Sequence, residues 1–576
     1  MRGLGPRLAV LALLLSAVPA AWGGEVRVAI EGVSGDLADQ VRHHVGEPAS
    51  ADPPALASFR RRVPERAQRA LEAVGYYGSE VTTRREREGE DVRVVVAIER
   101  GRAVTIERID VLITGPARDD PAFLGLEHRL GIEEGERLHH GRYEAARRAI
   151  HNLALDRGYF DGRFITRRVE VDPDAGRAEV ELHYHSGARY RFGEVVYSDS
   201  PLSSTFLQRM VPFDEGEPYS AEQLARFNRA LLDSGYFDDV RVRPQREAAE
   251  AGVVPVDVHL GMRARHEIRT GAGFTTDLGP RLRLGWHRPY VGRRGHSMSV
   301  ETQIAQRRQN LTSTYTIPLR DPLRTSLQFQ LGVQAVDVAD IETEQITASV
   351  QHRHRLDSGW QQVLSLRADR ERYRIAGEER TTQLYIPGVS WSRTRSRGGL
   401  DPTWGDRQML SLEAADPALA SDIELRRVRA ATRWVRTLGE RHRFLARAEA
   451  GALATDNFED VPPSLRFYAG GDQSVRGYRY QTLGPEQDGA VIGGRYLAVG
   501  SLEYGYQLTP SWRPAVFVDA GNALADWDDL ADEAKVGAGV GLRWSSPVGP
   551  IRLDVASTVG EADDSLRIHF SMGSDL

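Results

Sequence analysis

Apolar and polar residues alternate along most of the second half of the chain, from about residue 266 onward. Residues 327–334 (LQFQLGVQ) alternate without interruption, and residues 551–556 (IRLDVA) place arginine and aspartate on one face and branched apolar residues on the other. A period of two residues indicates β-strands with one apolar face. The pattern covers roughly 310 residues, which at about 19 residues per strand and turn predicts about sixteen antiparallel strands.

A helical pattern recurs three times in the first half of the chain. Residues 70–78 (ALEAVGYYG), 153–161 (LALDRGYFD) and 230–238 (ALLDSGYFD) each place a glycine and two aromatic residues after the helix. Glycine at that point suits the left-handed residue that ends a helix. Alternating segments before and after it, such as 104–109 and 178–184, predict strands. Each copy is therefore predicted to be a βααββ domain of about 75 to 85 residues.

Residues 1–24 have the pattern of a secretory signal peptide. Arg2 and Arg7 precede an apolar stretch at 8–18, and small residues follow up to a predicted cleavage near residues 23–24. The apolar stretch is too short to stay in the membrane as an anchor. An amphipathic first helix is the alternative interpretation of this segment.

Export bears on the choice between a soluble β-sandwich and a membrane barrel. A long run of strands after a signal peptide favours a closed barrel, in which no backbone group is left unpaired in lipid. The chain has no cysteine, which excludes disulfides, thiol catalysis and cysteine-ligated zinc. Its net charge of -6 argues against nucleic acid as the main partner.

The stretch 470–478 (GGDQSVRGY) carries the most specific motif of the chain. Val475, Arg476, Gly477 and Tyr478 resemble the signature of the sixth extracellular loop in the BamA/TamA superfamily of outer-membrane barrels. Two further segments resemble the same family, VFVDAGN at 516–522 and GLRWSSPVGP at 541–550. The glycine–tyrosine–aromatic element of the three repeats is similar to that of POTRA domains, the periplasmic repeats of this family.

The resemblance implies a domain order. It predicts a signal peptide at 1–24, POTRA domains at 25–101, 102–187 and 188–264, and a transmembrane barrel at 265–576. The expected fold class is therefore α+β POTRA repeats (βααββ) followed by an all-β barrel of about 16 antiparallel strands. Three repeats resemble the TamA-type members, since BamA-type proteins generally carry five. In this family the sixth loop folds back into the lumen.

Alternation places an acidic wall opposite the motif arginine. The neighbours of Asp519 in the strand 516–522 would face lipid, so Asp519 would face the lumen. Arg476, on an inward-folded loop, can supply a planar two-pronged donor to that carboxylate, and Glu503 is the second candidate acceptor on the wall. Gly477 would let the loop turn tightly. The alternative is that Arg476 is a solvated loop arginine.

Other candidate sites carry weaker signals. The chain has neither a Gly-x-Ser-x-Gly elbow nor a His-Glu-x-x-His pair, so no catalytic residue, metal ligand or cofactor is predicted. The pairs His43–His44 and His139–His140 are interpreted as solvated. The basic stretch Arg393–Arg397 is interpreted as a solvated loop or turn, with contact to lipopolysaccharide phosphate as the alternative.

The leading hypothesis for function is protein assembly in the outer membrane. The first and last barrel strands, near 268–274 and 566–572, would meet at a seam that opens sideways and offers its edge to a client strand. Glycines weaken a strand ladder, and Phe570 resembles the C-terminal signal of outer-membrane proteins. The residues assigned to the seam are Gly271, Gly273, Phe570 and Gly573.

The resemblance also implies partners. These are a TamB-like protein anchored in the inner membrane, unfolded outer-membrane clients such as autotransporters, and outer-membrane lipid and lipopolysaccharide. The second hypothesis is a two-partner secretion pore that exports one dedicated substrate. The third is an outer-membrane hydrolase, which would require a cluster of serine, histidine and aspartate at the extracellular rim.

Overall fold

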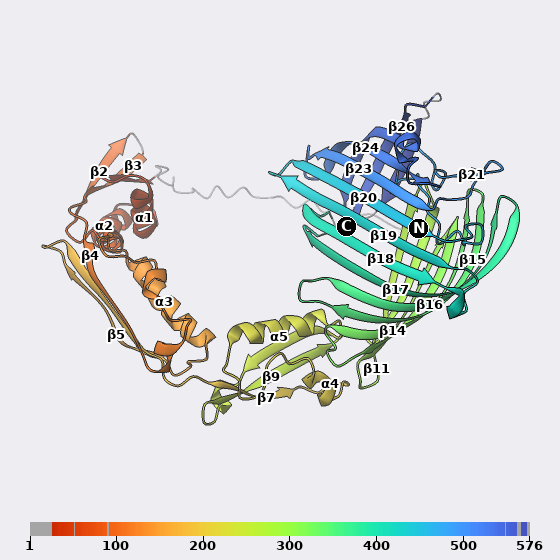
Figure 1. The fold of residues 1–576 in the computed structure, drawn as a ribbon. Coiled ribbons are helices and arrows are strands. Elements are labelled where there is room, and N and C mark those ends of the chain that lie inside the picture. Colours follow the sequence, from red (N-terminus) through yellow and green to blue (C-terminus); the bar gives the residue numbers. More distant parts are fainter. Residues whose placement is uncertain are drawn as a thin grey trace, which may run out of the picture. The chain divides into compact units, whose positions relative to one another are not determined.

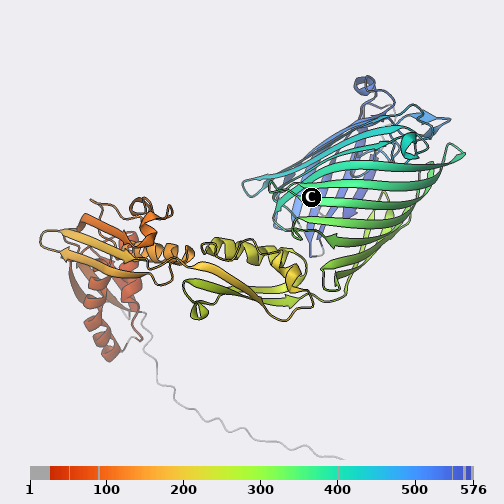
Figure 2. The same cartoon turned by 60° about the horizontal axis from the view of Figure 1, so that its bottom comes forward.

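The computed structural model describes residues 26–50, 52–88, 91–399, 401–547, 549–561 and 566–572. The predicted signal peptide at 1–24 and Gly573 of the predicted seam lie outside these ranges. No helix within the ranges is long and apolar enough to cross a membrane. Figures 1 and 2 show sheets with helices in the first half of the chain and long strands around a closed wall in the second half.

Three three-stranded sheets form the first half, with strand orders β1-β3-β2, β4-β6-β5 and β7-β9-β8. In the first two sheets the middle strand is parallel to the first strand and antiparallel to the second. The first unit contains β1 (Val26–Glu31), α1 (Asp36–Val45), α2 (Pro53–Glu72), β2 (Glu80–Glu88) and β3 (Asp91–Glu99). The second contains β4 (Thr105–Thr114), η1 (Pro116–Asp119), η2 (Glu127–Arg129), α3 (His140–Asp156), β5 (Arg163–Asp172) and β6 (Arg177–His185). The third contains β7 (Arg191–Tyr197), α4 (Ser204–Gln208), α5 (Ala221–Asp233), β8 (Phe237–Pro244), η3 (Arg246–Ala248) and β9 (Val253–Met262).

The helix α2 packs on its sheet because its apolar residues recur at helical spacing. Leu56, Phe59 and Val63 are buried and belong to one cluster with Val94 of β3. The Asp52 side chain begins the helix by accepting a hydrogen bond from a backbone N–H of the first turn at 2.7 Å. The same arrangement of apolar helix face and sheet forms a separate core in the second unit.

The second unit differs from the βααββ prediction. Two short 3-10 helices, η1 and η2, stand where the first helix was expected. Prolines at 116 and 121 and glycines at 125 and 131 interrupt this stretch, and both residue types oppose a continuous helix. In this unit the first helical position of the βααββ order is therefore occupied by two short 3-10 helices.

The glycine that follows the second helix of each unit is left-handed. Gly75, Gly158 and Gly235 have φ values of 88°, 85° and 82°, as expected for residues that end a helix. The carbonyl of Gly75 accepts a hydrogen bond from the N–H of Val104 at 2.8 Å, and that of Gly158 from the N–H of Tyr190 at 2.9 Å. The turn therefore also connects one unit to the beginning of the next.

The strands from β10 to β20 and from β23 to β27 close into one barrel of sixteen antiparallel strands. The predicted fold class and strand number are therefore confirmed. Outward positions carry apolar side chains such as Leu331, and their inward neighbours are polar, as at Gln330. The strands are β10 (Glu267–Thr275), β11 (Gly279–Val291), β12 (His296–Ala305), β13 (Arg308–Pro318), β14 (Thr325–Val338), β15 (Ile341–Arg355), β16 (Gln361–Ile375), β17 (Glu378–Arg397), β18 (Trp404–Ala415), β19 (Leu425–Leu438), β20 (His442–Ala454), β23 (Tyr496–Tyr506), β24 (Trp512–Leu524), β25 (Lys535–Ser546), β26 (Gly549–Val559) and β27 (Leu566–Met572).

The end of the barrel at which β10 begins is called the near end. The opposite end, where β10 finishes, is called the far end. Because successive strands are antiparallel, β17 runs from the far end to the near end. The interpretation of Arg393–Arg397 as a loop or turn is wrong, since these residues are the last part of β17 and pair in register with β18.

Candidate functional site

The connection between β20 and β23, residues 455–495, folds inside the barrel wall and is called loop 6. It contains a short hairpin of β21 (Glu486–Gln487) and β22 (Ala490–Val491), visible in Figure 1. Apolar side chains of the loop form one buried cluster with inward-facing residues of the wall. Burial of these groups holds the loop inside the barrel. The loop contributes Val461, Leu465, Phe467, Ala469, Val475, Tyr478 and Leu483, and the wall Leu384, Ile386, Leu425, Leu453, Leu497 and Ala523.

Arg466 determines the internal shape of loop 6. Its buried guanidinium donates to the backbone carbonyls of Val461 at 2.7 Å, Glu459 at 2.8 Å and Ile492 at 2.9 Å. One side chain therefore satisfies carbonyl groups from two separate stretches of the loop. The sequence did not predict this role, because backbone acceptors leave no residue pattern that identifies them.

The motif arginine, Arg476, is almost fully buried against the wall. Its Nε donates to Oδ2 of Asp519 at 2.7 Å and its Nη2 to Oδ1 of the same carboxylate at 2.9 Å. Its Nη1 donates to Glu503 at 2.9 Å. The guanidinium also stacks on the ring of Phe517, 3.4 Å from the centroid. The structure thus brings together the loop arginine and both predicted wall acceptors.

Three further charged residues complete this wall network, and the sequence did not identify them as partners. Arg476 also donates to Asp554 on β26 at 3.2 Å. Arg543 on β25 donates to Glu503 at 2.7 Å and also binds Asp554. Arg447 on β20 lies 3.7 Å from Asp519. The wall network therefore contains three arginines and three carboxylates, so its formal charge is balanced in a buried setting where an unpaired charge is costly.

A face of glycines on β25 makes room for the motif. A Cβ atom on Gly537 would lie 1.8 Å from the carbonyl oxygen of Arg476, and one on Gly541 would lie 1.9 Å from a carboxylate oxygen of Asp554. Gly539, between them, faces the ring of the phenylalanine on which Arg476 stacks. The sequence has glycine at every second position from 537 to 541. The role of these glycines could not be predicted, because the sequence does not show which strand loop 6 contacts.

Loop 6 also contacts both sides of the junction between the first and last strands. The N–H of Gly477 donates to Nε2 of His569 at 3.1 Å, and Nε of Arg567 donates to the carbonyl of Gly477 at 3.1 Å, both on β27. The N–H of Asp472 donates to the Asp277 carboxylate at 2.8 Å, in the turn after β10. The loop therefore bridges the junction from inside the barrel.

The junction between β10 and β27 has few backbone pairs. The described residues contribute one register pair, Thr275 with Ser571. By contrast, β26 and β27 share seven pairs and β10 and β11 share nine. Since each pair of strands in a closed barrel is held by its ladder of hydrogen bonds, this junction is weaker than its neighbours on either side.

The predicted seam residues lie at this junction where the structure describes them. Gly271 and Gly273 belong to the part of β10 that has no partner on β27 within the described ranges. Phe570 lies on β27, and its ring centroid is 5.9 Å from that of Phe274 on β10. The two rings add an outward-facing contact to the register pair and to the hydrogen bond that the N–H of Thr276 donates to the carbonyl of Phe570 at 3.2 Å.

We expect the contact between Asp277 and loop 6 to weaken at alkaline pH. Burial, together with the nearby Asp472 carboxylate, raises the pKa of Asp277 from 3.8 to about 8. A raised carboxyl pKa means that the contact retains a proton, so its stabilisation is complete below about pH 4 and is lost as the pH rises through about 8. Spin labels on Leu278→Cys and Gln473→Cys should therefore move apart as the pH rises, as measured by electron paramagnetic resonance.

The control for this measurement is Asp277→Asn, which is neutral at every pH and should keep the labels at one distance throughout. Arg307 faces the same turn and donates to the Asp277 carbonyl at 3.3 Å, a contact that the Asp277→Asn variant keeps. If the distance between the two labels does not change with pH in the protein that keeps Asp277, the contact does not depend on a proton at this carboxyl group.

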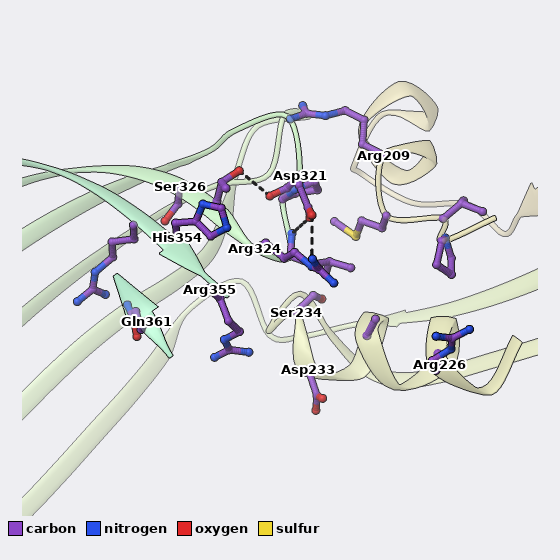
Figure 3. A pocket seen from close by; sticks show the side chains of 18 of the residues that line it. Arg209, Arg226, Asp233, Ser234, Asp321, Arg324, Ser326, His354, Arg355 and Gln361 are labelled. Atoms are coloured by element: carbon purple, nitrogen blue, oxygen red, sulfur yellow. Dashed lines mark hydrogen bonds and ion pairs between the residues drawn. The ribbon is translucent and has the colours of Figure 1, made fainter. Parts of the chain in front are cut away.

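A cavity of about 750 Å³ lies at the near end of the barrel. Figure 3 shows Arg209 and Arg226 on the side of α4 and α5, and Arg324 and Arg355 on the barrel side. Arg324 is paired with Asp357 at 2.7 Å. Arginines outnumber acidic residues in the lining, so the cavity is positively charged. Its charged lining residues are Arg209, Arg226, Asp233, Asp321, Arg324, Arg353 and Arg355.

Family models match both halves of the chain. Residues 291–576 match the Omp85 superfamily domain. Residues 27–100 match a model described as POTRA domain TamA domain 1, and residues 113–187 and 190–260 match the POTRA model, described as surface antigen variable number repeat.

Curated relatives are similar to this chain at low sequence identity. The chain is 22% identical over 522 residues to the outer membrane protein assembly factor BamA of Neisseria meningitidis serogroup B, covering 78% of this chain and 64% of the relative. It is 25% identical over 400 residues to the chloroplastic outer envelope protein 80 of Oryza sativa subsp. japonica, covering 62% and 57%. The chain therefore spans less than two thirds of these curated relatives. The crystal structure of Haemophilus ducreyi BamA lacking POTRA domains 1-3 has a TM-score of 0.69 at 17% identity, covering 82% of this chain and 99% of that one.

The closed barrel with its inward loop and the sheets that precede it define an outer-membrane protein with periplasmic domains. The chain is a member of the Omp85 superfamily, and its periplasmic domains are POTRA domains. The predicted location in the outer membrane is thereby confirmed. The near end of the barrel faces the periplasm, and the far end faces the outside.

Proposed function

We propose that the protein assembles other outer-membrane proteins by offering them the edge of its seam. The observation that supports this proposal is that the described residues form one register pair between β10 and β27, beside strands that are paired along their length. A seam with so few ladder bonds opens at low cost, and its free N–H and C=O groups can pair with a client strand. The protein would act by binding its clients, without chemical catalysis and without a cofactor.

Loop 6 would control how far this seam opens. The wall network around Arg476 fixes the loop to β23, β24 and β26. From that anchor the loop reaches β27 through Gly477 and the first hairpin through Asp472. A seam that opens must break the contact to Asp277, whereas the wall network can stay intact. The loop would thus allow one side of the seam to move while holding the other.

We further infer a TamA-type role, with a TamB-like partner anchored in the inner membrane and autotransporters among the clients. The match of residues 27–100 to the TamA-type first POTRA model supports this inference. The domain boundaries at 25–101, 102–187, 188–264 and 265–576 belong to the same proposal. The POTRA sheets would add a strand of the partner or client at their edges, and the basic cavity at the periplasmic end would receive acidic client segments.

A cross-link across the seam tests the assembly proposal. Because the chain has no cysteine, Thr275→Cys with Ser571→Cys would form a single defined disulfide between directly opposed residues. The expected result is loss of client insertion in the oxidised protein and recovery after reduction, since the ladder can no longer open. The measurement is the fraction of a denatured barrel client that becomes heat-modifiable in reconstituted vesicles.

The matched control places the same cross-link one strand away. Val555→Cys with Ile568→Cys joins an opposed pair of β26 and β27, which stays closed in the proposed mechanism, so insertion should continue. Full insertion by the oxidised seam protein would exclude lateral opening.

The partner is tested separately with the tagged, unmodified protein. Recovery of a large inner-membrane-anchored protein from gently solubilised envelopes would support the TamA-type role. Recovery of one secreted protein alone would favour a two-partner secretion pore, and a purified protein with large conductance would agree with it.

A further inference from the structure

Four arginines gather on the outer face of the barrel at its periplasmic end. Arg393, Arg395 and Arg397 occupy every second position at the end of β17, so their side chains share one face. Arg436, near the end of β19, lies beside them across β18, where it pairs in register with Trp404. These four residues are called the arginine cluster.

The arginine cluster faces lipid. On β17 the same face continues with Trp391, which pairs in register with Leu410 of β18. Leu410 and Leu412 are apolar and more than a third exposed, as expected for the outward side of a membrane barrel. The cluster therefore prolongs the lipid-facing surface of β17 and β19 toward the periplasmic end.

Tryptophan rings lie under the guanidinium groups. Arg397 and Arg436 lie 5.0 and 4.7 Å from the ring centroid of Trp404, and Arg436 also lies 4.8 Å from that of Trp434. Arg393 lies 4.9 Å from the ring of Trp360. Tryptophan is enriched at the level of lipid headgroups, so the rings place the cluster at the depth of the phosphates.

The arginine cluster carries more positive than negative charge. Its one carboxylate is Asp406, whose side chain is fully buried and accepts from Arg395 at 2.8 Å and lies 3.7 Å from Arg436. Within the described parts of the chain, no carboxylate pairs with Arg393 or Arg397. Four guanidinium groups therefore share one acid at the edge of the hydrocarbon region.

Two buried hydrogen-bond donors, one in the arginine cluster and one directly beside it, have no acceptor among the described protein atoms. Nε of Arg393 and Nε2 of Gln408 are inaccessible to solvent and make no hydrogen bond with the described protein atoms. The two residues are opposed in register on β17 and β18, so the unsatisfied groups lie together. Buried donors of this kind cost free energy unless an acceptor reaches them.

We propose that the arginine cluster binds the phosphate headgroup of an anionic phospholipid in the periplasmic leaflet of the outer membrane. A phosphodiester offers the anionic oxygens that planar guanidinium groups bind in pairs. Its acyl chains would continue along the apolar face formed by Leu410 and Leu412. Lipopolysaccharide is not the ligand, because the cluster lies at the end of the barrel that faces the periplasm.

The test removes the two arginines that Asp406 does not hold. The variant Arg393→Gln with Arg397→Gln leaves the pairs of Asp406 in place and should fold normally. Full-length protein would be titrated with phosphatidylglycerol in mixed micelles, and bound lipid counted by native mass spectrometry. The mole fraction of phosphatidylglycerol at half saturation should rise about twenty-five-fold, since each of the two basic residues at a membrane surface contributes a factor of about five.

The control removes two arginines from the outer face at the other end of the barrel. Arg372→Gln with Arg374→Gln alters residues that are paired with Glu379 and Glu342, and phosphatidylglycerol binding should not change. Equal binding by the cluster variant and the unmodified protein would overturn the proposal.

Two further arms identify the source of the phosphate. Inorganic phosphate in excess should not displace the lipid, and displacement would point to a free-anion site. Purified lipopolysaccharide should not compete, and its preferential binding would also overturn the proposal. Folding of each variant is checked by heat-modifiable migration, so that loss of lipid cannot be confused with loss of the barrel.

Discussion

Replacing Arg476 with methionine is expected to release loop 6 from the barrel wall. The arginine side chain is 3% exposed and that of Asp519 is 0% exposed, so the variant would leave a buried carboxylate without its two-pronged partner. Breaking one half of a buried ion pair costs about 3–5 kcal/mol. Cleavage of loop 6 by chymotrypsin in reconstituted protein should therefore accelerate by a factor on the order of one hundred or more.

The charge balance of the wall network makes a second variant informative. Removing both Arg476 and Asp519, as Arg476→Met with Asp519→Leu, leaves Arg447 and Arg543 with the two remaining carboxylates. This double variant should be cleaved more slowly than either single variant, because no buried charge is left over. Arg479→Met, at an exposed position of the same loop, is the control and should not differ from the unmodified protein. Equal cleavage of the unmodified protein and all four variants would show that the hydrophobic cluster alone holds the loop.

Alternation along single strands predicted much of the site. The period of two residues placed Asp519 and Glu503 on the inner wall, and the structure has both carboxylates on Arg476. The same period predicted about sixteen strands and the closed barrel. These inferences use only the neighbours of a residue along the chain, which a sequence displays directly.

Contacts between strands could not be predicted in the same way. Asp554 and Arg543 also point inward, but their place in the wall network depends on the register of β25 with β26. The bridge from loop 6 to Asp277 joins residues far apart in the chain. Arg393–Arg397 looked like a turn because its arginines alternate with small polar residues, although alternation is also how a strand presents one basic face. The proposed roles of the loop motif and the seam, and the domain boundaries, stay predictions.

Gly537→Val is expected to displace loop 6 from its position against the inner barrel wall while leaving the strand β25 in place. A Cβ atom at this position would lie 1.8 Å from the carbonyl oxygen of Arg476, far inside contact distance. That atom is backbone and cannot turn aside as the end of a side chain can, so the loop must move as a unit. Overpacking costs typically 1–3 kcal/mol, and here the displaced arginine would also lose its carboxylates. The measurement is again chymotrypsin cleavage of loop 6.

Comparison with Gly500→Val separates this effect from a general effect of valine in a barrel strand. A Cβ atom on Gly500 of β23 would meet nothing within 4 Å, and valine favours strands, so this control should keep the loop protected. If Gly537→Val also keeps the loop protected, the motif does not depend on close approach to β25. If Gly537→Val and Arg476→Met each expose the loop and Gly500→Val does not, the glycine face and the buried arginine hold the same docked position of loop 6. Either change alone then removes a contact that this position requires.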